Sequence, residues 1–244
     1  MTATAALSLC ELSDGELVSL GRACGLPLAA YRRSHLEACV TRAVVRMGVA
    51  DAGALTDRLR HDDSARAAFR RSVLVPVTRM FRDEAEFRTL ERKVLPELLA
   101  RRERLDVWSA GCATGDELRS VASLLERLGA LDGALLVGSD LLEDALERAA
   151  ELAARLADPM GGRFRFERRD LVVDDLPARR FDLVLCRNVA IYLEPSAQAA
   201  VHRKLVAALR PGGFLMLGAS ETLLRPERLG LEPVGRHLFR RAGA

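Results

Sequence analysis

Hydrophobic residues recur at helical spacing through the first part of the chain. Between about residues 12 and 72, leucine, valine, cysteine and alanine side chains follow three- and four-residue steps, and no strand pattern interrupts them. Ser13-Asp-Gly-Glu16 places a serine and a glutamate as a capping box does, which predicts that a helix begins there. Short helices are expected over 51–59 and 64–72. Residues 1–72 are therefore predicted to form an all-helical domain.

From residue 105 onward, short apolar runs alternate with longer amphipathic segments. Strands are predicted at residues 105–109, 134–139, 163–167, 181–186 and 214–218. Helices are predicted at residues 118–128, 143–156 and 195–209, and a turn at 158–162. The runs at 231–234 and 237–240 could close the sheet as an antiparallel pair. This order predicts an α/β fold with a mostly parallel sheet over residues 105–244, preceded by a linker helix region over 73–104.

Composition narrows the possible classes of protein. The 244 residues are 49% hydrophobic, which suits one large domain or a domain with a small helical companion. The net charge of +3 does not predict nucleic-acid binding. The five cysteines form neither a CxxC pair nor a Cys/His cluster, so no disulfide framework and no metal site is predicted. No signal peptide and no apolar run near the roughly 18 residues of a membrane span is found. A cytoplasmic protein without membrane insertion is expected.

Candidate binding residues follow three of the predicted strands. Gly111 and Gly115 lie in the turn after the first strand, where a glycine lets the backbone approach a ligand closely. Their GxxxG spacing lacks the middle glycine of a dinucleotide-binding loop, which argues against NAD. Asp140 ends the next strand, where an acidic side chain suits a ribose diol. Arg187-Asn188 follows the strongly apolar strand 181–186. Ligands of open α/β sheets bind at these strand ends.

Each feature also has a purely structural interpretation. The two glycines could serve the turn alone, Asp140 could cap the following helix, and Arg187-Asn188 could belong to a surface loop. The combined spacing favours a binding site. The four histidines lie outside these stretches and are interpreted as surface or packing residues.

Four stretches of the sequence resemble one known family, the CheR-type chemoreceptor glutamate methyltransferases. They occur in family order between about residues 75 and 222. These are Val77-Thr-Arg-Met-Phe-Arg-Asp83, Trp108-Ser-Ala-Gly-Cys-Ala-Thr-Gly-Asp-Glu117, Phe181-Asp-Leu-Val-Leu-Cys-Arg-Asn-Val-Ala-Ile-Tyr192 and Pro211-Gly-Gly-Phe-Leu-Met-Leu-Gly-Ala-Ser-Glu221. The resemblance implies a Rossmann-like class I S-adenosylmethionine methyltransferase domain, with a seven-stranded sheet, behind a small helical domain. It also implies S-adenosylmethionine as cofactor and S-adenosylhomocysteine as product.

The resemblance assigns roles position by position. Thr78 and Arg82 would lie at the methionine end of the cofactor, with Arg82 and Tyr192 at the methyl-transfer centre. The remaining cofactor-binding positions would be Glu117 at the amino group, Asp140 at the ribose, Asp170 and Leu171 near the adenine, and Arg187 and Asn188 along its border. From the residues alone, Arg82 could equally pair with Asp83 or Glu86 on a solvated helix.

The implied chemistry agrees with the absence of a catalytic triad or acid pair in the motifs. A glutamate carboxylate, with a reference pKa of about 4.3, is ionised and nucleophilic at neutral pH. Methyl transfer from a sulfonium then needs alignment and exclusion of water but no general base.

The chain departs from the family at three places. Pro76 replaces an asparagine, and Leu118-Arg119 replaces Pro-Tyr. Residues 140–170 leave little room for the β-subdomain that some members use to grip a receptor tail, so no tail-peptide tether is expected.

The expected partner is a methyl-accepting chemoreceptor-like protein. Ten arginines of the helical domain could dock its acidic helices, or they could be solvated helix faces. They are Arg22, Arg32, Arg33, Arg42, Arg46, Arg58, Arg60, Arg66, Arg70 and Arg71. The departures leave two alternatives open: a regulatory module that binds the cofactor without catalysis, and a methyltransferase for another substrate.

Overall fold

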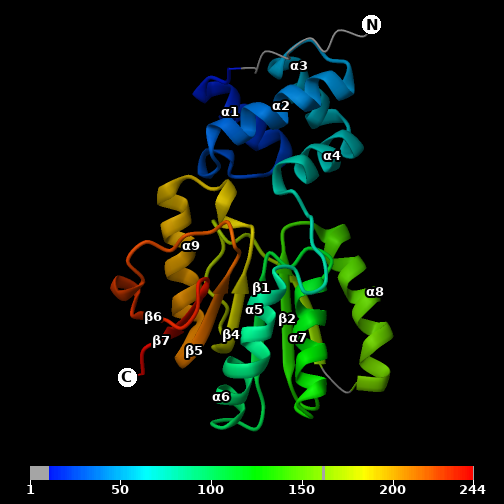
Figure 1. The fold of residues 1–244 in the computed structure, drawn as a ribbon. Helices are drawn as coiled ribbons and strands as arrows, with labels where there is room; N and C mark the ends of the chain where they lie inside the picture. The colour runs from blue at the N-terminus through cyan, green and yellow to red at the C-terminus, as the bar shows by residue number, and fades with distance from the viewer. Residues whose placement is uncertain (1–10, 161–162, 244) are drawn as a thin grey trace, which may run out of the picture. The chain divides into compact units, whose positions relative to one another are not determined.

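The chain forms two compact units. A computed structural model describes residues 11–160 and 163–243 (Figure 1). Of these described residues, the helical unit contains 11–75 and 192–197, and the sheet unit contains 76–160, 163–191 and 198–243.

Four α-helices build the helical unit. They are α1 (Asp14–Cys24), α2 (Arg33–Met47), α3 (Ala52–His61) and α4 (Asp63–Leu74), with a short 3-10 turn, η1 (Leu28–Ala30), after α1. Gly25 and Gly48 end α1 and α2 in the left-handed conformation that terminates helices, and Asp51 and Asp62 cap the starts of α3 and α4. The apolar faces of the helices pack into a small core that includes Leu20, Leu36, Leu55, Leu59 and Phe69.

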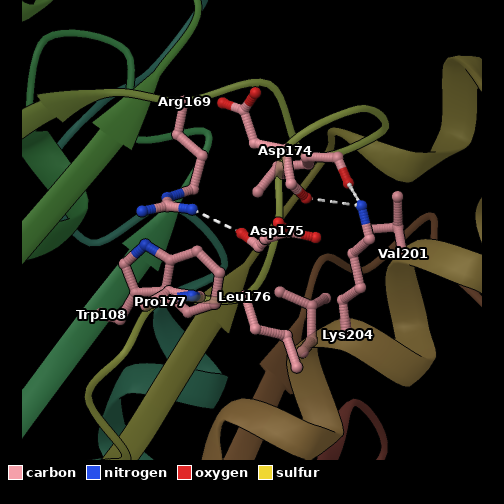
Figure 2. Close-up of a pocket in the computed structure, with 10 residues that line it drawn as sticks. Trp108, Arg169, Asp174, Asp175, Leu176, Pro177, Val201 and Lys204 are labelled. Atoms are coloured by element: carbon pink, nitrogen blue, oxygen red, sulfur yellow. Dashed lines mark hydrogen bonds between the residues drawn. The ribbon is translucent and has the colours of Figure 1, made fainter.

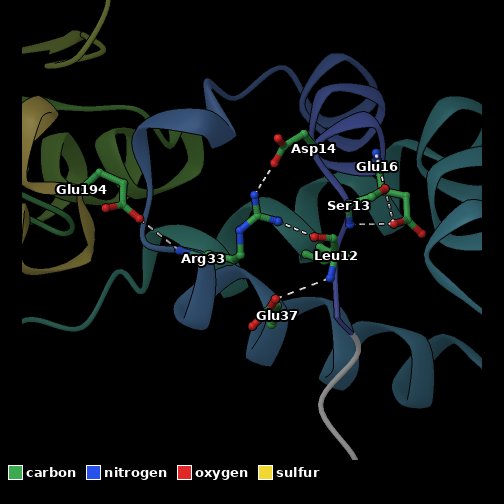
Figure 3. Close-up of polar contacts among 7 residues, drawn as sticks. All are labelled: Leu12, Ser13, Asp14, Glu16, Arg33, Glu37 and Glu194. Atoms are coloured by element: carbon green, nitrogen blue, oxygen red, sulfur yellow. Dashed lines mark hydrogen bonds and ion pairs between the residues drawn. The ribbon is translucent and has the colours of Figure 1, made fainter.

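The predicted capping box is present at the start of α1. Ser13 Oγ accepts the backbone N–H of Glu16, and the Glu16 carboxylate accepts the N–H of Ser13 (Figure 3). The Arg33 guanidinium of α2 donates to the carbonyl of Leu12 and pairs with Asp14, which ties the start of α1 to α2.

A distant segment of the chain completes the helical unit. Leu193 forms an isolated antiparallel bridge with Tyr31, and the backbone N–H of Arg32 donates to the carbonyl of Tyr192 at 2.9 Å. The N–H of Glu194 donates to the carbonyl of Ala30 at 2.8 Å. The unit is therefore discontinuous in sequence.

The sheet unit contains a seven-stranded sheet in the order β3-β2-β1-β4-β5-β7-β6 (Figure 1). The strands are β1 (Asp106–Ala110), β2 (Leu135–Asp140), β3 (Arg163–Arg168), β4 (Phe181–Cys186), β5 (Leu209–Leu217), β6 (Leu231–Pro233) and β7 (Leu238–Arg241). The strands β1 to β5 are parallel, and β7 pairs antiparallel with both β5 and β6. The predicted fold class is confirmed.

Helices cover both faces of this sheet. One face packs against the chain that forms α5 (Glu84–Thr89), the π-helical turn η2 (Leu90–Val94), α6 (Leu95–Leu99) and α7 (Asp116–Arg127). Phe164 and Phe166 of β3 pack against this same core. On the other face, α9 (Pro195–Ala208) contributes Val201 and Leu205 beside Trp108 of β1. The central strands β1, β2 and β4 are largely buried on both faces because both faces are covered, whereas the edge strand β3 alternates exposed and half-buried residues.

Two local predictions were wrong. The helix α8 (Glu143–Met160) continues through residues 158–160 of the predicted turn, while residues 161–162 lie outside the described part of the chain. Its alanine- and leucine-rich sequence favours helix, and Pro159 stands in the last turn. Strand β5 begins at Leu209 and runs through Pro211-Gly-Gly213, because Leu209 pairs with Phe181 ahead of a register shift in the β4–β5 pairing. No helix in the part of the chain that the structure describes is long and apolar enough to cross a membrane.

Candidate functional site

The turn after β1 lies against the end of β2. The backbone N–H groups of Gly111 and Cys112 both donate to the carbonyl of Ser139, at 2.8 and 2.9 Å. Since β1 is flanked by β2 and β4, the carboxyl ends of all three strands meet at one edge of the sheet. The predicted residues Gly111, Asp140 and Arg187 are thereby brought to this edge.

The two glycines of the turn adopt positive φ values, 80° at Gly111 and 78° at Gly115. A Cβ at Gly111 would collide with the side chain of Val189, and one at Gly115 would lie 3.1 Å from Cβ of Ala149. The conformation and neighbouring protein atoms both require glycine at Gly111. The expectation that glycine clears space for a ligand is thus not needed to explain these residues.

Asp140 organises the same edge through its carboxylate. Oδ2 accepts the N–H of Ala113 at 2.8 Å, and Oδ1 accepts the N–H groups of Leu141 and Leu142 at 2.7 and 3.0 Å. Burial raises the pKa of Asp140, and these three N–H donors oppose the increase. A carboxylate has roughly four lone-pair positions, so the contacts within the protein leave room for about one further donor.

Glu117 is the second residue of α7, and only 7% of its surface is exposed. Its Oε1 atom has no hydrogen-bond partner among the described residues. Burial raises the pKa of Glu117 from its ordinary 4.5 to about 7, against the opposing effect of Arg187, and the like charge of Glu221 adds to the increase. A buried carboxyl oxygen without a partner is costly, so the position suits a cationic ligand group.

Asn188 follows β4 with a φ of 61°, an uncommon value for a residue other than glycine. Its Oδ1 atom is buried and, within the described residues, also has no hydrogen-bond partner. Glu117 and Asn188 therefore contribute two buried acceptor oxygens without partners to the site.

Arg187 points to the segment that contains Arg82. Its guanidinium is almost fully buried and donates to the carbonyl of Arg82 and to Asp83 Oδ2, each at 2.6 Å, and it lies over the ring of Phe87. Asp83 therefore pairs with Arg187. The Arg82 side chain donates to the carbonyl of Val77 at 3.3 Å and lowers the pKa of Glu117.

The same segment is also fixed from α7. The backbone N–H of Phe81 donates to Ser120 Oγ at 2.9 Å, and this hydroxyl in turn donates to the carbonyl of Asp116. Phe81 and Asp83 have φ values of 50° and 59°, so left-handed residues flank Arg82 on both sides. Such strained conformations persist where surrounding contacts determine them. Leu118, which stands where the family has proline, packs in the apolar core.

Asp170 and Leu171 lie in the loop after β3. Asp170 Oδ1 accepts the N–H of Val172 at 2.8 Å, which closes a tight turn. Lys204 of α9 donates to the carbonyl of Asp174 at 2.7 Å (Figure 2). It also donates to the carbonyls of Leu171 and Val172 at 3.2 and 2.9 Å. This loop and α9 enclose a small pocket that Trp108 also lines.

Tyr192 belongs to the helical unit. It ends the 3-10 turn η3 (Ala190–Tyr192), and its ring contacts the ring of His35 in α2 with centroids 4.6 Å apart. Its catalytic role stays a prediction.

Three residues with clear roles in holding the site were not singled out from the sequence. They are Lys204, Ser120 and Glu221, whose carboxylate accepts the N–H groups of residues 188–190 and 218. Only Glu221 had a signal, as the last residue of a family-like stretch. No group of three potential metal ligands occurs in residues 11–160 and 163–243.

The sheet order and the helices on both faces define an α/β domain of the Rossmann-like class. The family described as "CheR methyltransferase, SAM binding domain" matches residues 76–157 and 154–234. The chain belongs to this family of CheR methyltransferases, and S-adenosylmethionine is its cofactor.

Several relatives are similar over most of the chain. A chemotaxis protein methyltransferase of Listeria monocytogenes is 28% identical over 240 residues, covering 88% of this chain and 91% of that protein. Chemotaxis protein methyltransferase 1 of Pseudomonas aeruginosa is 28% identical over 251 residues, covering 86% and 90%. An uncharacterized 104.1 kDa protein of Rhodobacter capsulatus is 37% identical over 213 residues, covering 74% of this chain but only 22% of that protein.

Among solved structures, an S-adenosylmethionine-dependent methyltransferase from Mesorhizobium loti is 32% identical. The match covers 50% of this chain and 51% of that one, with a TM-score of 0.36.

The residues at the site fit this cofactor. Its methionine part carries an ammonium group with three N–H donors, and Glu117 Oε1 and Asn188 Oδ1 are buried acceptors without partners. The positive charge of that ammonium group would offset the burial of the Glu117 carboxylate.

Proposed function

We propose that the protein transfers the methyl group of S-adenosylmethionine to glutamate side chains of a chemoreceptor-like protein. The family and the names of the relatives support this proposal. The observation that carries it is that Glu117 and Asn188 both present buried acceptor oxygens without partners. Arg187, the residue before Asn188, donates to the backbone carbonyl of Arg82.

The reaction needs no proton transfer. A carboxylate oxygen of the substrate attacks the methyl carbon, the carbon–sulfur bond breaks, and its electron pair stays on sulfur. The products are a methyl ester and S-adenosylhomocysteine. Because the nucleophile is already ionised at neutral pH, the protein has to align the two reactants and exclude water.

We assign Glu117 and Asn188 to the cofactor ammonium, Asp140 to the ribose, and Asp170 with Leu171 to the adenine. Thr78 and Arg82 would lie at the methionine end, and Arg82 would orient the substrate carboxylate through its fork of N–H donors. Arg187 bonds to residues 82 and 83, which supports an indirect role for it.

Transfer of radiolabelled methyl groups tests the proposal. Wild-type protein and S-adenosylmethionine are incubated with a receptor cytoplasmic fragment, and volatile methanol released by base reports methyl esters. Arg82→Ala is expected to lower kcat at least tenfold. Arg88→Ala, at an exposed residue of α5, is the matched control and should leave kcat unchanged. Tight S-adenosylhomocysteine binding without any methyl ester would instead favour a regulatory module.

The helical unit supports a narrower docking surface than its arginine content suggests. Arg33, Arg58, Arg60 and Arg66 are paired with nearby aspartates. On α2, the exposed Arg42 and Arg46 stand four residues apart, and Val45 between them is 57% exposed.

We propose that acidic receptor helices dock on this face of α2, where opposite charge would guide association. Arg42→Glu with Arg46→Glu is expected to raise the KM for the receptor at least fivefold at low salt. It should leave S-adenosylhomocysteine affinity unchanged. Arg58→Glu with Arg60→Glu is the control on α3, and an equal effect of both pairs would contradict a specific docking face.

A further inference from the structure

Glu221 lies after β5 and is 2% exposed, yet its carboxylate is fully used. Oε2 accepts the backbone N–H groups of Gly218 and Asn188 at 2.7 and 2.9 Å. Oε1 accepts those of Ala190 and Val189 at 2.9 and 3.1 Å. A carboxylate that collects backbone N–H groups forms charge-assisted hydrogen bonds, which are stronger than neutral ones.

These four bonds join two loops that are far apart in sequence. Gly218 begins the loop that follows β5, and residues 188–190 lie in the turn that follows β4. A Cβ at Gly218 would lie 2.8 Å from the Asn188 nitrogen and 2.9 Å from Glu221 Oε2, so the two loops are packed as closely as glycine allows. The hydrogen bonds to Glu221 hold Asn188 at its positive φ.

The turn held by Glu221 contacts two parts of the proposed site, the acceptor oxygen of Asn188 and the segment that contains Arg82. Asn188 presents its unpartnered Oδ1 atom, and the preceding Arg187 holds the carbonyl of Arg82 and the side chain of Asp83. Ala190, whose N–H is bound by Glu221, begins the 3-10 turn that ends at Tyr192. A shift of this turn would therefore displace both the cofactor border and the Arg82 segment.

We propose that Glu221 is a positioning residue for methyl transfer, which fixes the turn after β4 so that Asn188 and Arg187 are preorganised for the cofactor. This inference rests on the proposed function. The charge of Glu221 also acts on Glu117, because it is one of the causes that raise the Glu117 pKa. Geometry and charge at this residue can be separated by two variants.

Glu221→Gln keeps the side-chain length but removes the charge and replaces one acceptor oxygen with an NH2 group that faces backbone donors. Glu221→Asp keeps the charge but shortens the reach. Glu227→Gln, at an exposed residue of the 3-10 turn Pro226–Leu229, is the matched control. S-adenosylhomocysteine binding is measured by calorimetry from pH 5.5 to 8, methyl transfer by steady-state kinetics, and folding by circular dichroism.

Both Glu221 variants are expected to weaken S-adenosylhomocysteine binding at least tenfold and to raise the KM for S-adenosylmethionine, with the receptor KM changed less than twofold. Only Glu221→Gln should move the midpoint of the pH dependence of binding to lower pH, since only it removes the like charge near Glu117. Glu227→Gln should match wild type in every measurement.

Two results would overturn the inference. The first is a folded Glu221→Gln protein with wild-type affinity and pH profile. The second is loss of folding in both variants, which would assign Glu221 to stability alone. If the wild-type protein itself neither binds S-adenosylhomocysteine nor transfers methyl groups, the proposed function fails before the variants are compared.

Discussion

Replacement of Glu117 by glutamine should change the pH dependence of cofactor binding. In the structure, burial raises the pKa of Glu117 from 4.5 to about 7, so the carboxyl group is mostly protonated at pH 6 without ligand. A cofactor ammonium favours the ionised form. Binding at pH 6 should therefore release about 0.9 proton, and affinity should rise up to about tenfold per pH unit from 5.5 toward 7.

The substitution removes this dependence. Glu117→Gln should bind S-adenosylhomocysteine with a nearly pH-independent affinity over the same range. At pH 7 it should bind roughly 10- to 100-fold more weakly than wild type, because a hydrogen bond to a charged group is worth about 1.5–3 kcal/mol. Titration calorimetry in buffers of different ionisation enthalpy measures both affinity and proton release. Glu126→Gln, at an exposed residue of the same helix, is the control.

The same pKa predicts the effect on stability. A carboxyl pKa that is raised in the folded protein makes folding less favourable as pH rises from 4.5 to 7, by up to about 3 kcal/mol above pH 7. Relative to wild type, Glu117→Gln should therefore gain stability between pH 5 and pH 8 in chemical denaturation. A flat wild-type binding profile from pH 5.5 to 7, or no proton release at pH 6, would refute the reasoning.

Three further changes follow from contacts at the site. Gly111→Ala forces a side chain into a positive-φ position and against Val189, so it should destabilise the fold by about 1–3 kcal/mol or more in urea denaturation; a neutral effect would contradict the described turn. Lys204→Met leaves three loop carbonyls without their ammonium donor, so it should lower the free energy of unfolding by about 2–3 kcal/mol. It should also weaken S-adenosylhomocysteine binding several-fold in a titration, whereas Lys93→Met, at the only other lysine, should change neither quantity. Arg187→Lys cannot replace the planar fork and should lower kcat at least tenfold in the methyl-transfer assay, whereas near-normal kcat would argue against the Arg82 linkage.

Much of the fold was predictable because the apolar runs of parallel strands are short and strongly marked. Strand β4 has the predicted bounds, 181–186, since all six of its residues are buried and turns flank both ends. The β5 boundary was missed because pairing of Leu209 with Phe181 is a contact between distant residues, and it outweighs the local Pro-Gly-Gly turn signal.

For the site, the sequence identified which turns meet but not what holds them. The cofactor and the family are confirmed, whereas the individual residue roles stay predictions. Lys204 and Glu221 act on backbone groups about 30 residues away. Such loop-to-loop contacts leave no local periodicity or spacing, so only coordinates reveal them. The alternative interpretation, that Arg82 pairs with Asp83, was wrong, because Asp83 pairs with Arg187.

The discontinuity of the helical unit has a consequence for how the chain is made. During synthesis the helices α1 to α4 emerge first, but the partners of Tyr31, Arg32 and Ala30 are residues 192–194, which are added more than 150 positions later. At roughly 5–20 residues per second, those backbone contacts wait on the order of ten seconds or more. A fragment that stops at residue 75 would lack these contacts permanently, so the helical unit reaches its full set of backbone hydrogen bonds only in a chain that extends past residue 194.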